Sequence, residues 1–269
     1  MKRLLAVVLC LMLAFSTVGC GSAETAPQPE KTTSADEAGV PAASGDKQAI
    51  ICDSYDGFKN SKDAYEKHIL DASKDHEVVS VNQGLVTAFE LGILNYLLPL
   101  NILGQSIKTT GNFDKNMEVL MLESGWADNV NLTDNGDASY QITGEYDKDK
   151  WKVDVAYDAA TDSLRLVGYQ NDVLAIIFEY SKSGSGYAAQ YYFENITGYD
   201  KATPVYKWCT YRTVFENNDG SSARFEGADS EPASIYKNAP DAETFISGAT
   251  QWLTVTDGSF TGKLNGIEF

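Results

Sequence analysis

Alternation of apolar and polar residues dominates the second half of the chain. It is clearest in residues 151–158, where the apolar positions are Trp151, Val153, Val155 and Tyr157. A period of two residues predicts a β-strand with one buried and one solvated face. Similar segments, bounded by Gly, Asn and Asp turns, predict strands at 117–123, 139–146, 163–169, 173–181, 187–195, 205–216, 222–226 and 252–256. Consecutive hairpins of this kind build one large antiparallel β-meander.

A helical period precedes these strands. It predicts one helix over 60–72 and a second, strongly apolar helix over 82–106, kinked at Pro99. Glu90 is the only charge between residues 84 and 104. Because the apolar face of the sheet needs a cover, we expect an α+β fold in which the N-terminal helices cover a curved sheet or half-barrel. A lining for an apolar ligand and a contact with a membrane or partner are the alternatives for the second helix.

The N-terminus has the pattern of an export signal. Lys2 and Arg3 precede the apolar run 4–15, which is too short to span about 30 Å of hydrocarbon as a helix. The following Thr17-Val18-Gly19-Cys20 resembles the lipobox of bacterial lipoproteins, although Thr17 stands where Leu is usual. The resemblance implies that residues 1–19 are a signal peptide, that Cys20 carries a diacylglycerol, and that the protein lies on the extracytoplasmic face of the cell membrane. Secretion with cleavage after Ala23 is the alternative.

Composition then divides the rest of the chain. Residues 20–48 are rich in Ala, Ser, Thr and Pro and predict a lipidated cysteine followed by a disordered tether. Residues 49–269 are long enough for a single α+β domain. The net charge of the whole chain is −17, and removal of Lys2 and Arg3 with the signal peptide lowers it to −19. Such a charge argues against nucleic acid as a partner and for the acyl chain as the membrane contact.

Residues that often perform chemistry are few. Cys52 and Cys209 are candidates for one disulfide, with two buried free thiols as the alternative. His68 and His76 lack the spacing of a zinc site. The sequence contains no nucleophile elbow or phosphate-binding glycine motif. We therefore expect no metal, no cofactor and no enzymatic activity.

The predicted meander with its helical cover resembles the half-barrel of envelope lipoprotein carriers of the LolA type. This resemblance is architectural, and it implies an apolar ligand enclosed between the sheet and the helices. The residues expected to line such a site are Phe89, Leu94, Leu98, Tyr192, Tyr206 and Trp208.

Aromatic residues crowd two neighbouring predicted strands, between residues 187 and 215. Alternation sends Tyr191 and Phe193 to one face and Tyr192 to the other, so some of them can serve as exposed platforms for a carbohydrate or peptide.

Three hypotheses follow: a binding or envelope-interaction protein for an apolar ligand, a carbohydrate or peptide binder, and a hydrolase that uses acid pairs such as Asp154 and Asp158. An enclosed cavity favours the first, exposed aromatics the second, and acids converging in a cleft the third.

Overall fold

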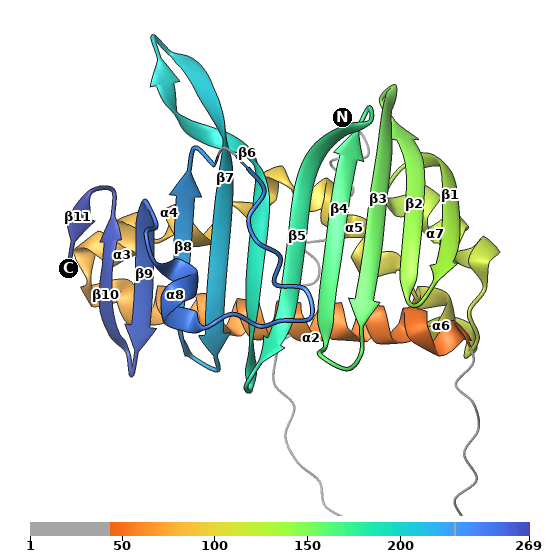
Figure 1. Ribbon diagram of the computed structural model, residues 1–269, viewed down its shortest axis with the longest axis horizontal. Helices are drawn as coiled ribbons and strands as arrows, with labels where there is room; N and C mark the ends of the chain where they lie inside the picture. The colour runs from red at the N-terminus through yellow and green to blue at the C-terminus, as the bar shows by residue number, and fades with distance from the viewer. Residues whose placement is uncertain (1–43, 229) are drawn as a thin grey trace, which may run out of the picture. The chain divides into compact units, whose positions relative to one another are not determined.

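The computed structural model describes residues 44–228 and 230–269, which belong to one compact unit that starts at residue 42. A layer of helices covers one face of an open, eleven-stranded antiparallel sheet (Figure 1). The predicted α+β fold, a meander covered by N-terminal helices, is confirmed. The predicted signal peptide, Cys20 and most of the predicted tether lie outside the described residues.

Each strand of the sheet pairs with its neighbours in the sequence, so the topology is a simple meander. The strands are β1 (Asp128–Gly136), β2 (Ser139–Tyr146), β3 (Asp149–Asp158), β4 (Ser163–Gln170), β5 (Val173–Ser183), β6 (Gly186–Asp200), β7 (Thr203–Glu216), β8 (Asp219–Glu226), β9 (Gln251–Thr256), β10 (Ser259–Leu264) and β11 (Ile267–Glu268). Tight turns join most of them. In the β4–β5 turn, Asn171 and Asp172 have φ values of 53° and 64°, a conformation that Asn and Asp tolerate better than other side chains.

The helical layer begins with one long helix that crosses the sheet. In chain order the helices are α2 (Ser44–Ala72), η1 (Ser73–Asp75), α3 (Glu77–Asn82), α4 (Gly84–Thr87), η2 (Glu90–Gly92), α5 (Leu94–Ile102), α6 (Gln105–Thr110) and α7 (Lys115–Gly125). Helix α2 starts at Ser44, well before the predicted residue 60. The Ser61 hydroxyl donates to the Gly57 carbonyl within this helix (2.9 Å). The earlier turns are held by the buried side chains of Ile51, Tyr55 and Phe58.

The predicted continuous helix over 82–106 is wrong. The chain breaks near Ala88, at Ile93 and at Leu103-Gly104, where Gly104 has a φ of 92°. Pro99, the predicted kink, lies inside α5. Its missing N–H would have bonded the Asn95 carbonyl, which instead accepts the indole N–H of Trp126 (2.8 Å). Among the described residues, no helix has the length and apolar character of a membrane span.

The strand predicted at 117–123 is also wrong, because this segment forms α7. Asp114 caps the helix: its Oδ1 accepts the backbone N–H groups of Asn116 (2.9 Å) and Met117 (3.2 Å). The alternation of Met117, Val119 and Met121 had favoured a strand. The side chains that α7 buries completely are instead four residues apart, Glu118 and Leu122.

Aromatic rings fill the space between α2 and the sheet. Phe58 stacks on Tyr180 of β5 with ring centroids 4.6 Å apart, and Tyr65 stacks on Phe215 of β7 at 5.1 Å. Phe89, which precedes η2, stacks on Tyr211 at 4.1 Å. Side chains thus occupy the interior that a half-barrel carrier would leave to its ligand.

The opposite face of the sheet carries a cover that the sequence did not predict. Residues 230–250, which we call the strap, connect β8 to β9, contain α8 (Ala242–Ile246) and pass in front of the strands in Figure 1. Ile235 and Phe245 of the strap form a second small core with Ala188 and Val214. The fully buried carboxylate of Glu179 fixes the strap, accepting the Ser234 hydroxyl (2.6 Å), the Ile235 N–H (2.9 Å) and the Gln190 amide (2.8 Å), and pairing with Arg165.

Candidate ligand-binding cleft

Strands β5 and β6 separate at one end of the sheet. Their pairing stops at Ile176 opposite Phe193, although β5 continues along β4 and β6 continues along β7. A register irregularity between Gly168 and Tyr169 of β4 accompanies this fork. A Cβ at Gly168 would lie 2.7 Å from Cδ1 of Tyr96, so glycine is required for α5 to pack against the fork.

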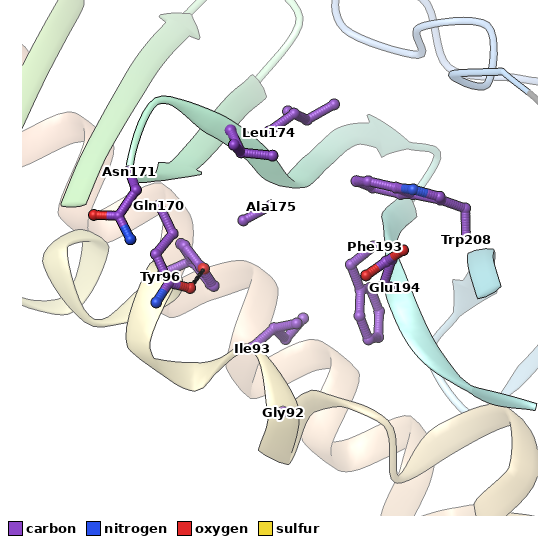
Figure 2. Close-up of a pocket in the computed structure, with 11 residues that line it drawn as sticks. Gly92, Ile93, Tyr96, Gln170, Asn171, Leu174, Ala175, Phe193, Glu194 and Trp208 are labelled. Atoms are coloured by element: carbon purple, nitrogen blue, oxygen red, sulfur yellow. Dashed lines mark hydrogen bonds between the residues drawn. The ribbon is translucent and has the colours of Figure 1, made fainter. Parts of the chain in front are cut away.

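A cleft of about 400 Å³ opens at the fork. In Figure 2, Ile93 and Tyr96 of the helical layer lie along one side of the cleft. Leu174 and Ala175 of β5 lie across the cleft from the side chains of Phe193 and Trp208. Its lining residues are Gly92, Ile93, Tyr96, Gln170, Asn171, Val173, Leu174, Ala175, Phe193, Glu194 and Trp208. The lining therefore combines aromatic rings with amides and one carboxylate.

Hydrogen bonds fix the amide end of the cleft. The Tyr96 hydroxyl donates to Oε1 of Gln170 (3.2 Å), and the amide nitrogens of Gln170 and Asn171 each donate to Asp149 (2.7 Å). Burial, together with the Asp149 carboxylate, raises the pKa of Tyr96 to about 12. This end of the cleft is a rigid polar wall.

The carboxylate at the other end is exposed and unpaired. Glu194 lies directly opposite Trp208 in the β6–β7 ladder. Within the described residues, no hydrogen bond or ion pair joins its carboxylate to another side chain, whereas Asp149 is held by two amides. Glu194 is thus available to a ligand beside an indole ring.

Beyond the cleft, the β6–β7 hairpin projects past the rest of the sheet (Figure 1). Trp208 stacks on Tyr192 with centroids 4.5 Å apart and an interplanar angle of 24°. Tyr206 and Tyr199 follow on the same face and are 57% and 70% exposed. A bulge between Ile196 and Gly198 inserts one extra residue into β6, and this shift is what brings Tyr199 to that face. We call Tyr192, Trp208, Tyr206 and Tyr199 the aromatic row.

The structure separates the six predicted lining residues into two groups. Tyr192, Tyr206 and Trp208 come together in the aromatic row, and Trp208 also lines the cleft. Phe89 and Leu98 pack against the core, and Leu94 is 40% exposed on the helical layer. The sequence missed Ile93, Tyr96, Gln170 and Glu194, because they meet only through the fork. Glycine inside the strand pattern, at Gly168, is the signal that could have marked a close approach there.

A second, shallower hollow lies on the helical layer. This apolar groove of about 600 Å³ is lined by Ile102, Gln105, Met117, Leu120, Met121, Ser124 and Gly125. It opens between α5, α6 and α7, on the surface and not between the helices and the sheet. It therefore differs from the enclosed site predicted for a half-barrel carrier.

The predicted disulfide is wrong, since Cys52 and Cys209 are both free and buried. Cys52 lies on α2, where its sulfur receives a contact from the Gln105 amide (3.7 Å), and Cys209 lies on β7 beside Arg224. Two residues far apart in the sequence need not meet, and here each packs against a different element. Burial raises the pKa of both thiols, which disfavours the reactive thiolate.

The remaining candidate groups have structural partners. Ligand atoms of Cys52, Asp53 and Asp56 lie within 4.8 Å of one another, but the Lys108 ammonium already pairs with both carboxylates, at 3.0 and 3.2 Å. An internal cation thus takes the position a metal ion would need. His76 caps α3, accepting the Val79 N–H at 3.4 Å.

Comparisons of the chain with protein-family models, curated proteins and solved structures found no match.

Proposed function

We propose that this protein is a non-enzymatic carbohydrate-binding protein, held on the extracytoplasmic face of the cell membrane by a lipid on Cys20. The observation that carries the proposal is the continuity of the aromatic row with the cleft through Trp208. Sugar rings have apolar faces that pack on aromatic rings and hydroxyls that bond amides and carboxylates. The row and the cleft present both kinds of group side by side.

The packing of the interior argues against an enclosed apolar ligand. Leu97, Leu100 and Leu103 of the helical layer are buried, and Phe89 fills the space beneath Tyr211. The cleft itself contains the Glu194 carboxylate, which an acyl chain would leave without a partner.

The lining also argues for binding over hydrolysis. Glycoside hydrolysis normally uses two carboxyl groups roughly 5 to 9.5 Å apart across the scissile bond. Among the residues that line the cleft, Glu194 is the one carboxylate. The acid pair considered in the sequence does not converge there, because Asp154 accepts the Gln141 amide (2.8 Å) and Asp158 pairs with Lys237 (3.0 Å).

The test is a panel of oligosaccharides followed by titration of any hit, with Trp208→Ala and Tyr206→Ala as the binding variants. We expect Trp208→Ala to weaken binding at least about tenfold, the order of one lost aromatic contact, and Tyr206→Ala to have a smaller effect. Leu120→Ala is the matched control, since Leu120 is exposed in the groove away from the cleft.

Two results would overturn this proposal. One is the absence of binding across the panel; the other is equal affinity in Trp208→Ala and the unaltered protein. Native mass spectrometry of protein purified from its host checks the competing hypothesis, since a copurifying lipid would favour an apolar ligand.

The anchor is tested separately, because Cys20→Ser should move the protein from the membrane fraction to the soluble fraction.

A further inference from the structure

We propose that the glycan bound in the cleft carries a positive charge, as an N-deacetylated amino sugar does, and that Glu194 is the counter-ion of its ammonium group. This inference rests on the proposed function and names the class of its ligand. It starts from the one carboxylate of the cleft and from the rings beside it.

The first step concerns the state of Glu194. Two acids elsewhere on this sheet are paired: Glu179 pairs with Arg165, and Asp158 pairs with Lys237 (3.0 Å). The Glu194 carboxylate is exposed, has no such partner within the described residues and lines the cleft. A ligand that brings a cation would supply the missing charge.

The second step concerns the rings around it. Trp208, Phe193 and Tyr96 line the same cleft, and Figure 2 shows Glu194 between the Trp208 and Phe193 side chains. The faces of aromatic rings attract cations, indole most strongly. A carboxylate next to an indole therefore favours an ammonium group over a neutral hydroxyl or acetamide.

The third step concerns the charges that surround the ligand. Neither Lys nor Arg lines the cleft, and the chain carries a net charge of −17. The field of such a protein attracts cations and repels glycans that carry carboxylates, sulfates or phosphates. Local and overall electrostatics thus point to the same ligand class.

The experiment compares oligomers that differ in the acetylation of the amino nitrogen on each sugar. Isothermal titration calorimetry measures binding of a glucosamine tetramer and of its N-acetylated counterpart, at a pH where the free amine is protonated. We expect the glucosamine tetramer to bind about tenfold more tightly, the order of one ion pair reinforced by a cation–π contact, and to bind more weakly as salt is added. Glu194→Gln should reduce both the preference and the salt dependence.

Glu231→Gln is the matched control, because Glu231 is an exposed carboxylate on the strap. Equal affinity for the two tetramers, or an unchanged preference in Glu194→Gln, would overturn the charge assignment while leaving carbohydrate binding intact. If neither tetramer bound, nor any other glycan of the panel, the proposed function would fall together with this inference. A urea unfolding curve for each variant separates loss of binding from loss of fold.

Discussion

At the scale of single residues, Glu179 ties the strap to the outer face of the sheet. Its carboxylate is fully buried and joins β5 to the strap through Ser234 and the Ile235 N–H, while Arg165 supplies the positive charge. Removing one partner of a buried pair typically costs about 3–5 kcal/mol, because the remaining groups lose their acceptor. We expect Glu179→Ala to lower the free energy of unfolding by an amount near the lower end of this range, since the Arg165 side chain is 29% exposed and can reach water.

Urea unfolding followed by tryptophan fluorescence measures this cost. Limited proteolysis within residues 230–250 should become faster in the same variant, because the strap loses one of its attachments to the sheet. Glu231→Ala removes an exposed carboxylate from the same segment and should leave both measurements unchanged. A loss of stability below about 1 kcal/mol in Glu179→Ala would contradict the role given to this residue.

Tyrosine ionisation should limit stability at alkaline pH. Burial and the nearby Asp162 carboxylate raise the pKa of Tyr157 and of Tyr187 from 10 to about 12. Above pH 10 the unfolded chain loses these protons while the folded chain keeps them. The free energy of unfolding therefore falls as the pH rises from 10 to about 12, and the contribution is fully present below pH 10.

The variant that isolates this effect is Tyr187→Phe. Urea unfolding at several pH values should show a shallower fall in stability between pH 10 and 12 than in the unaltered protein, and a constant difference below pH 10. Tyr206→Phe changes an exposed tyrosine and should follow the unaltered curve. Parallel curves for Tyr187→Phe and the unaltered protein across this window would refute the assignment.

At the scale of elements, the bulge in β6 decides the composition of the aromatic row. Side chains alternate between faces along a strand, so loss of one residue moves every later side chain to the other face. Deletion of Thr197 should therefore turn Tyr199 away from Tyr206 without disturbing the main sheet, which ends before this part of the hairpin.

Glycan affinity is the measurement for this element. We expect deletion of Thr197 to weaken binding by the same factor as Tyr199→Ala, about threefold to tenfold for one exposed aromatic contact. Thr197→Ala keeps the bulge and should bind like the unaltered protein. If the deletion bound normally while Tyr199→Ala did not, the faces assigned to the hairpin would be wrong.

The sequence predicted best those elements in which the pattern of apolar and polar residues matches the buried and solvated faces. In β3, Val153 and Val155 alternate with half-buried polar residues, and the strand forms where the pattern places it. The helix α7 escaped prediction because a cap at Asp114 and the burial of Glu118 outweigh a short alternation. Pro99 lies inside α5, where a distant side chain, Trp126, satisfies the carbonyl that proline leaves free.

At the scale of the whole molecule, the sequence predicted the aromatic half of the candidate site better than the rest. Tyr206 and Trp208 are two residues apart on one strand, so alternation alone groups them. The cleft joins α5, the β4–β5 turn and the start of the projecting hairpin, which come together only through the fork in the sheet. Local pattern does not encode such a meeting.

The two thiols of the folded unit also lie on segments that are distant in the sequence, and the fold does not bring them together. Cys52 and Cys209 are buried, unpaired and shifted to higher pKa, so a thiol reagent should reach them only when the molecule opens. In a chain that starts at residue 42, where the compact unit begins, we expect two thiols to react quickly in denaturant and very slowly in native buffer. A reducing agent should leave the urea midpoint unchanged, because no disulfide constrains the unfolded state of this unit. Fewer than two reactive thiols in denaturant, together with a midpoint lowered by the reductant, would show instead that the two cysteines pair.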